Sequence, residues 1–430
     1  MASRISPNDR GSEFIGSEYE LEITNVAHGG VGVSRHEGRV IFVADTIPGE
    51  TVRARITDAT QKSFWRADTV EVLKASPHRQ PHIWAAASVD LDPRDRAGGA
   101  EFGHITLARQ RELKEFVLTD SLSRMAHLTQ EVTVEALPGD EESKGTNWRT
   151  RVRLHVDEGG TVGPYAARSH RVIPVRDLPL ATDTLAQLAP LGGFMPDMEY
   201  VDLIDPSGEE PRMIVTSREA GRVKVRPARD PLREIVGNRE FAVDARGFWQ
   251  VHRQAATTLS TAVTAMIDEE LFEPHAANLD LYGGVGLFAA AIGDRFGSST
   301  GMTVVESDDM AVAYAAENLA EWAGAYAISA RVDDFMRDLV DNATADEKVY
   351  FEQATVVLDP PRAGAGRDVI EGLAQMRPAQ IIYVACDPVA LARDVESLAR
   401  LGYKMANLRA FDLFPNTHHV EAIARFIPAG

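Results

Sequence analysis

The feature that most constrains the fold is an apolar run that ends on a cysteine. Residues 381–385 (IIYVA) are bulky and largely β-branched, and Cys386, Asp387 and Pro388 follow them directly. A run of this length and composition is typical of a buried central strand, and Pro388 ends it. Cys386 is the only cysteine in 430 residues. The sequence therefore predicts a thiol at the carboxyl end of a strand, which is the edge at which open α/β sheets bind ligands.

Two other segments predict strands that end on polar or flexible residues. The apolar run 354–358 leads directly into Asp359, and the segment 277–288 has the pattern of a strand, a glycine-rich turn and the start of a helix. Because parallel strands present their carboxyl ends at one edge of the sheet, we expect this carboxylate, this turn and the thiol to lie together.

Strand and helix patterns alternate from Phe241 to the C-terminus, which indicates a parallel sheet with crossover helices. The segments 404–411 and 420–426 predict a terminal antiparallel pair, and the segment 327–332 predicts another strand. We interpret residues 239–430 as a Rossmann-like α/β domain, within a multidomain α/β protein.

The rest of the chain predicts two β-rich domains. Residues 1–16 are polar and lack periodicity, so we expect a disordered leader. Residues 17–76 hold five short alternating runs punctuated by glycine, which predict a small barrel of the oligonucleotide-binding (OB) kind, although any five-stranded barrel would give this pattern. Residues 77–238 predict a central mixed β domain that contains a loop-rich segment and one long helix.

The charge of the chain argues against a generally basic surface. There are 45 basic and 64 acidic residues, and the formal net charge is −19. The central region is different, because residues 145–176 hold six arginines against two acids and residues 218–239 hold seven basic residues against three acids. Each cluster taken alone could be a solvated face. Together they predict a surface that follows the phosphates of a nucleic acid, for which we select Arg149, Arg151, Arg222 and Arg226.

The glycine-rich turn predicts a nucleoside-bearing cofactor when it is taken with the next strands. Gly284 and Gly286 allow close approach of a ligand to the backbone, but the turn does not match GxGxxG and could be a tight turn without a ligand. Glu306 ends the next predicted strand, where an acid accepts hydrogen bonds from ribose hydroxyls. Asp333 follows the third strand, within reach of a base edge.

Cys386 beside such a cofactor suggests covalent catalysis on an electrophilic carbon, although a lone cysteine is also a common core residue. C6 of uracil is such a carbon. Attack there makes C5 a nucleophile that can accept a methyl group, and a base must then remove the C5 proton. Glu421 is available as that base, although in isolation it would more often be a surface strand residue.

These segments resemble the RNA 5-methyluridine methyltransferase family, which uses S-adenosylmethionine. The resemblance covers nearly the whole chain, and the N-terminal barrel resembles the TRAM domain of those enzymes. It implies that Cys386 is the nucleophile and Glu421 the proton-removing base. Contacts to the cofactor or the target base are implied for Gln250, Tyr282, Gly284, Gly286, Glu306, Asp333 and Asp359. The matching motifs are NWRTRVR (147–153), FWQVH (248–252), LDLYGGVG (279–286), LDPPRAG (358–364), YVACDPVALARD (383–394) and FPNTHHVE (414–421).

The chain departs from this family at two places. Many relatives hold an iron–sulfur cluster on four cysteines, but this chain has Gly98–Gly99–Ala100 in the corresponding loop and a single cysteine overall. We therefore expect no iron–sulfur cluster and no metal, and a loop held by packing alone. Leu287 replaces a polar residue that touches the cofactor in many relatives.

We conclude from the sequence that the chain is an S-adenosylmethionine-dependent methyltransferase acting on uridine C5 in tRNA or large-subunit rRNA. One alternative is a methyltransferase for an exocyclic amine, but such enzymes need no thiol and carry an aromatic residue where Arg362 stands here. Another is an RNA-binding or RNA-folding factor with a vestigial methyltransferase domain, against which the intact Cys386 and Glu421 weigh. No apolar run approaches the length that spans a bilayer, and we expect a cytoplasmic monomer.

Overall fold

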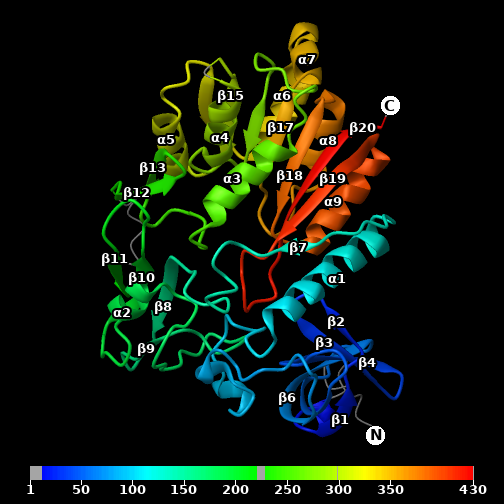
Figure 1. The fold of residues 1–430 in the computed structure, drawn as a ribbon, viewed down its shortest axis with the longest axis vertical. Coiled ribbons are helices and arrows are strands. Elements are labelled where there is room, and N and C mark those ends of the chain that lie inside the picture. The colour runs from blue at the N-terminus through cyan, green and yellow to red at the C-terminus, as the bar shows by residue number, and fades with distance from the viewer. Residues whose placement is uncertain (1–11, 220–227, 298, 430) are drawn as a thin grey trace, which may run out of the picture.

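The computed structural model describes residues 12–219, 228–297 and 299–429. Figure 1 shows a small β domain at the N-terminal end, a central β-rich region, and a large α/β domain formed by the C-terminal half of the chain. This arrangement confirms the predicted fold class. Among the described residues, no helix has the length and apolar character required to cross a membrane.

The N-terminal domain is a curled sheet of six strands in the order β1-β5-β6-β4-β3-β2. The structure therefore has one strand more than the sequence predicted. The predicted leader is also shorter than 16 residues, because Ser12–Phe14 forms a 3-10 helix and the Phe14 ring lies 4.7 Å from that of Trp65; residues 1–11 lie outside the described residues. The strands are β1 (Glu18–Glu22), β2 (Asn25–Ala27), β3 (Val31–His36), β4 (Arg39–Ala44), β5 (Thr51–Asp58) and β6 (Phe64–Lys74).

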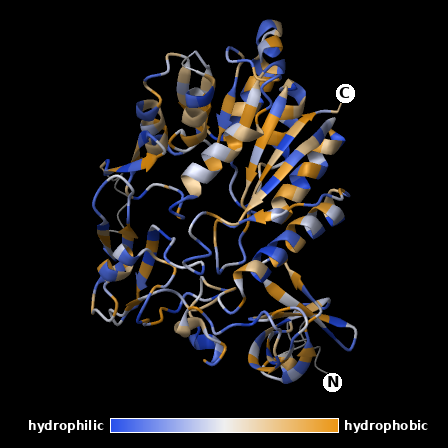
Figure 2. Ribbon diagram, viewed as in Figure 1, coloured by the Kyte–Doolittle hydropathy of each residue, from blue (hydrophilic) through white to orange (hydrophobic). Residues whose placement is uncertain are grey.

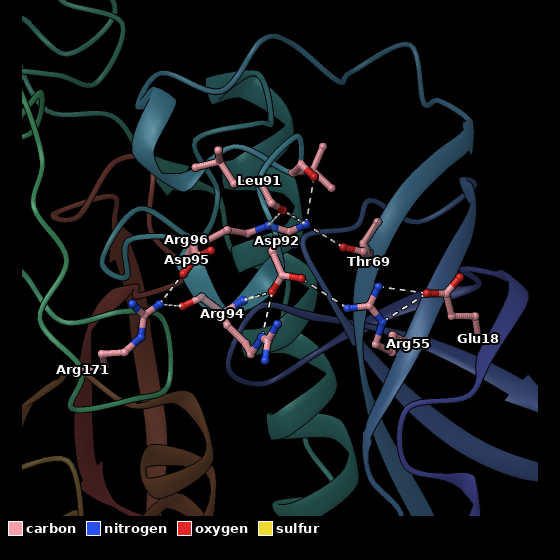
Figure 3. A network of polar contacts seen from close by, with 10 residues as sticks. Glu18, Arg55, Thr69, Leu91, Asp92, Arg94, Asp95, Arg96 and Arg171 are labelled. Carbon is pink, nitrogen blue, oxygen red and sulfur yellow. Dashed lines mark hydrogen bonds and ion pairs between the residues drawn. The ribbon is translucent and has the colours of Figure 1, made fainter.

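The loop that follows this domain is held by a hydrogen-bonded arginine, and not by packing alone as the sequence led us to expect. The side chain of Arg96 is 3% exposed. Its guanidinium donates to the carbonyl oxygens of Val89, Leu91 and Thr69 and pairs with Asp45 at 2.6 Å. Figure 3 shows how Arg96 links the loop to strand β6 of the N-terminal domain. A buried guanidinium has to satisfy its five donors, and here two loop carbonyls, the Thr69 carbonyl of β6 and the Asp45 carboxylate accept from it.

The central region holds a four-stranded sheet in the order β11-β10-β8-β9 and a separate hairpin, β12-β13. Two elements of the predicted central domain, 77–238, pack against the C-terminal half of the chain. Helix α1 (Leu107–Met125) packs against helix α9 (Pro388–Arg400), and strand β7 (Val134–Glu135) joins the C-terminal sheet as a parallel neighbour of β19. The other elements are β8 (Arg151–Val156), β9 (Val162–Gly163), α2 (Asp183–Leu188), β10 (Met198–Ile204), β11 (Arg212–Ser217), β12 (Pro231–Val236) and β13 (Arg239–Asp244).

The C-terminal sheet has eight strands in the order β16-β15-β14-β17-β18-β20-β19-β7. All neighbours are parallel except β20, which runs antiparallel to both β18 and β19, so the predicted terminal antiparallel pair is confirmed. The elements are α3 (Ala255–Met266), β14 (Leu279–Leu281), α4 (Leu287–Phe296), β15 (Met302–Glu306), α5 (Asp309–Asn318), β16 (Ala325–Ser329), α6 (Val332–Asn342), α7 (Ala345–Glu352), β17 (Thr355–Leu358), α8 (Arg367–Met376), β18 (Gln380–Ala385), β19 (Tyr403–Phe411) and β20 (Glu421–Pro428).

Both faces of this sheet are covered by helices, which explains the apolar strands visible in Figure 2. Along β18, Ile381 and Tyr383 pack with helices α6, α8 and α9, whereas Ile382 and Val384 pack on the other face with α3, α4 and α5. Because helices cover both faces of a parallel sheet, its central strands are apolar at every position, and their sequences are continuous apolar runs. The predicted strand 327–332 is wrong at its end, because Val332 already begins helix α6.

Candidate active site

The predicted residues that follow strands of the C-terminal sheet meet at one edge. Leu281 of β14 pairs with Leu358 of β17, and Leu358 pairs with Tyr383 of β18. Tyr282 and Asp359 therefore follow neighbouring strands, and Cys386 lies at the end of the next strand.

Glu421 reaches the same place from the opposite direction. Ala385 of β18 pairs with Ala422 of the antiparallel strand β20. One further step in this register places Cys386 opposite Glu421. Directly opposed residues of an antiparallel pair point their side chains to the same face, so the thiol and the carboxyl group are neighbours.

The carboxyl groups at this edge are held in a buried environment. Glu421 is 5% exposed, and burial together with the nearby Asp359 raises its pKa well above the usual range. Burial raises the pKa of Asp359 to about 7. Two close carboxyl groups do not readily ionise together, because like charges repel in a poorly solvated site. The pair can therefore hold a proton at neutral pH, which suits acid–base chemistry.

The thiol of Cys386 is half-buried and protonated in this environment. Burial contributes most to a pKa raised to about 12, and the carboxyl groups of Glu421 and Asp359 add to it, whereas the positive charge of Arg362 opposes the shift. The thiolate is the nucleophilic form of cysteine. The structure thus describes a resting thiol that has to lose a proton before it can react.

Asp280 is a further buried carboxyl group that the sequence analysis did not assign. It lies inside β14 and is fully buried; its Oδ2 accepts the Ala289 N–H of helix α4 at 3.0 Å. Among the described residues its Oδ1 has no hydrogen-bond partner. Burial raises the pKa of Asp280 to about 7. The available signal was a charged residue inside an otherwise apolar strand, since such residues are rarely buried without a role.

The glycine-rich turn lies beside Glu306, as predicted. The N–H of Gly284 donates to Oε2 of Glu306 at 3.2 Å. Gly284 and Gly286 have φ values of 55° and 86°, which glycine adopts without strain. A side chain at Gly283 would come within 2.7 Å of Val304, whereas no described atom lies within 4 Å of the corresponding position at Gly284. The turn is therefore packed against strand β15 at Gly283, whereas space is open beside Gly284.

Asp333 and Gln250 are the two predicted cofactor residues that lie outside the glycine-rich turn and the strand ends described above. Asp333 lies in the first turn of α6, not directly after a strand, and pairs with Arg331 at 2.7 Å. Burial and the charge of Asp333 raise the pKa of Tyr282 to about 12, so these two residues are close. Gln250 is half-buried between β13 and α3, where the neighbouring Val251 carbonyl accepts from the N–H and hydroxyl of Thr150.

A buried network that was not predicted fixes the loop after Asp359. Asp394 of α9 is 2% exposed, and its Oδ2 accepts from the Tyr383 hydroxyl at 2.7 Å and from the Ala365 N–H at 2.8 Å. The Tyr282 hydroxyl donates to the Ala365 carbonyl at 3.3 Å. Two strand ends and one helix therefore hold the backbone at Ala365.

Helix α1 holds the segment that leads into Glu421. Buried Lys114 pairs with Asp412 at 2.5 Å and donates to the Phe414 carbonyl at 3.1 Å. The side chain of Gln110 accepts from the Asn416 N–H at 2.7 Å. This anchoring explains why a helix from the first third of the chain belongs to the catalytic sheet.

His419 lies on the anchored segment next to Glu421. Burial lowers its pKa to about 3, and the positive charges around it add to that effect. It lies 3.3 Å from the Arg362 guanidinium. His419 is therefore neutral at physiological pH.

The two predicted RNA-contact residues that the structure describes, Arg149 and Arg151, have different surroundings. The side chain of Arg151 is 12% exposed; its guanidinium donates to the Gly247 carbonyl at 2.9 Å and faces Glu234 at 3.7 Å. These contacts tie β8 to the β12–β13 hairpin and give Arg151 a structural role. Arg149 lies over the Trp148 ring at 5.8 Å and is partly buried. Arg222 and Arg226 lie outside the described residues.

Comparison with known proteins finds matches along the whole chain. The profile of tRNA (Uracil-5-)-methyltransferases matches residues 254–424, and that of the TRAM domain matches residues 13–64. An uncharacterised RNA methyltransferase of Streptomyces avermitilis is 37% identical, over 96% of this chain and 99% of the relative. A 23S rRNA (uracil(1939)-C(5))-methyltransferase of Shewanella sediminis is 27% identical, over 99% of both chains. The solved structure of the Pyrococcus abyssi tRNA (uracil-54, C5)-methyltransferase with S-adenosyl-L-homocysteine has a TM-score of 0.67 at 20% identity, and covers 95% of this chain and 100% of that chain.

Proposed function

The chain belongs to the RNA 5-methyluridine methyltransferase family with an N-terminal TRAM domain, and we propose that it methylates C5 of a uridine in structured RNA through a covalent bond from Cys386 to C6. The observation that carries the proposal is the opposition of Cys386 and Glu421 at the end of the β18–β20 pair. A thiol and a buried carboxyl group side by side supply the nucleophile and the base that this reaction needs.

The residues at the sheet edge fit S-adenosylmethionine, which supplies an electrophilic methyl group when bound. The backbone above Gly284 is open, and Glu306 beside it can accept hydrogen bonds from ribose hydroxyls. The free Oδ1 of Asp280 lies beneath the same turn, where a cofactor amine or a water can satisfy it. We assign Gln250, Tyr282, Asp333 and Asp359 to the remaining contacts with the cofactor or the target base.

The residues of the chain then act in a fixed order. Cys386 loses its proton to solvent, and the sulfur adds to C6, so that C5 becomes a nucleophile. C5 takes the methyl group. Glu421 then removes the C5 proton, the electron pair re-forms the C5–C6 double bond, and the sulfur leaves as a thiolate. The raised pKa of Glu421 makes its ionised form a stronger base than an ordinary carboxylate, which suits removal of the C5 proton.

The target RNA would bind over the central and N-terminal domains, with Arg149 as the described candidate for a phosphate contact. We keep Arg222 and Arg226 as RNA-contact proposals from the sequence, and we expect Arg151 to act by supporting the hairpin.

The proposal is tested by incubating the purified protein with labelled S-adenosylmethionine and with transcripts of tRNA and of large-subunit rRNA. Nucleoside mass analysis should find 5-methyluridine in one RNA class, at a single position. Methylation of an exocyclic amine, or no transfer to either class, would contradict it.

A further inference from the structure

We propose that the N-terminal TRAM domain completes the active site, and that His28 is a positioning residue which holds Asp387 and through it Cys386. The proposal rests on the role proposed above for Cys386. The contact joins residues 359 positions apart in the chain: Nε2 of His28 lies 2.9 Å from Oδ2 of Asp387. Asp387 follows Cys386 directly in the chain. A contact that fixes the Asp387 side chain therefore also restrains the backbone that carries the thiol.

The two oxygens of Asp387 have different partners. Oδ1 accepts the N–H groups of Val389 and Ala390 at 3.0 and 2.8 Å, and so caps the N-terminus of helix α9. Oδ2 is left for His28. The Asp387 side chain is 19% exposed and that of His28 is 46% exposed. Because one oxygen caps helix α9 and the other is bound by the N-terminal domain, the rotamer of Asp387 is fixed by contacts with both.

A close backbone contact next to His28 supports the same docking. The turn between β2 and β3 carries His28, Gly29 and Gly30. A side chain at Gly30 would lie 2.5 Å from Cβ of His418 and 2.8 Å from the Phe102 ring, so only glycine fits there. No described atom lies within 4 Å of the corresponding position at Gly29. Of the two glycines, only Gly30 therefore lies against the segment that leads into Glu421.

The turn also closes one side of the thiol. A cavity of about 10 Å³ lies between the turn and the catalytic domain, which is room for about one water and too little for a nucleobase. Its wall includes His28, Gly30, Phe102, Cys386, Pro388 and His418. Release of the turn would open this side of Cys386 to solvent.

The charge on His28 strengthens the contact at low pH. The hydrogen bond to Asp387 raises the pKa of His28 above 6.5, although burial and the charge of Arg362 oppose this shift. A group whose pKa is raised in the folded state holds its partner best while it is protonated, and loses that part of the attraction as the pH rises through its pKa. The charged groups that act on His28 are Asp387 at the start of α9 and Arg362 of the loop after β17. The other titratable side chains that line the same cavity are Lys114 of α1 and His418 and His419 of the loop before β20.

The lone cysteine makes a direct test possible in the full-length protein. The rate of Cys386 alkylation by iodoacetamide reports on the thiol without any RNA or cofactor. We expect His28→Ala to raise this rate about two- to fivefold, the range of a half-exposed ion pair, and His28→Gln to raise it less, because glutamine keeps an N–H donor. At about pH 9 the wild type and His28→Gln should converge, since histidine is then neutral.

Adjacent glycines supply the matched control. Gly29→Ala and Gly30→Ala place the same side chain on backbone of positive φ, 87° and 72°, but only the second meets the catalytic domain. We expect faster alkylation in Gly30→Ala than in Gly29→Ala. Equal rates in these two variants, or an unchanged rate in His28→Ala, would overturn the proposal.

Covalent capture of RNA that contains 5-fluorouridine separates positioning from simple exposure. His28→Ala should form this adduct more slowly while its thiol alkylates faster, with the affinity for S-adenosylmethionine unchanged. Faster alkylation with an unchanged adduct rate would show that His28 only shields the thiol, and would overturn the positioning role. If the wild type forms no adduct, the proposed chemistry fails, and the alkylation rates still decide whether His28 holds the site.

Discussion

Cys386 and Glu421 lie opposite each other one step beyond the last paired residues of β18 and β20, Ala385 and Ala422, although they are 35 positions apart in the sequence. The register that produces this opposition is set by the apolar alternation of both strands. A shift of one residue would turn Glu421 to the other face of the sheet. The closeness of Cys386 and Glu421 therefore depends on the register of these core strands.

Glu421→Gln tests the late base. Glutamine keeps the shape of the side chain but cannot take the C5 proton, so we expect one methyl transfer followed by a stalled covalent protein–RNA complex. Mass analysis of the complex should find the new methyl group on the trapped uracil. Normal multiple turnover would reassign the base, and a stall without methyl incorporation would place Glu421 before the transfer step.

The pH dependence of the free thiol tests its environment. Because burial and the neighbouring carboxyl groups raise the pKa of Cys386 to about 12, the thiolate fraction should grow with pH over the whole neutral range. The alkylation rate of the free protein should rise about tenfold per pH unit up to about pH 9. A plateau below about pH 8 would show a thiol of ordinary or lowered pKa.

Asp394→Asn tests the network that holds the loop after Asp359. The Asp394 carboxylate accepts from both Tyr383 and the Ala365 N–H, and both bonds are buried. We expect the free energy of unfolding to fall by about 1–3 kcal/mol, as measured by chemical denaturation. Asp368→Asn is the control, because that side chain is 67% exposed on helix α8 and should change the stability by less than about 0.5 kcal/mol. If both substitutions changed the free energy of unfolding equally, the Asp394 network would not be what holds the loop.

Arg96→Lys tests what holds the loop that follows the N-terminal domain. Lysine keeps the charge but cannot reach Thr69, Val89, Leu91 and Asp45 together, so we expect a loss of roughly 2 kcal/mol or more in the free energy of unfolding. Arg94→Lys is the matched control, because the Arg94 side chain is 86% exposed. Similar unfolding curves for the two variants would mean that packing holds the loop.

The sequence predicted the parts of the site that depend on strand ends. Asp359 and Cys386 were found because apolar runs stop at them, and parallel strands stop at one edge. The contacts of His28, Lys114 and Arg96 were missed, since each joins segments far apart in the chain and local periodicity carries no signal for such pairs. The packing of α1 against α9 and the pairing of β7 with β19 were missed for the same reason, and the two residues of β7 are too few to form a pattern.

The most direct test of the covalent route uses RNA that carries 5-fluorouridine at the position methylated in the natural transcript. Fluorine at C5 cannot be removed as a proton, so the intermediate should accumulate. The account predicts a protein–RNA band that survives denaturing electrophoresis, requires S-adenosylmethionine, and disappears in Cys386→Ala, although that variant still binds the cofactor. Enzyme that methylates unmodified RNA but leaves no such band, or a Cys386→Ala variant that still turns over, would contradict it.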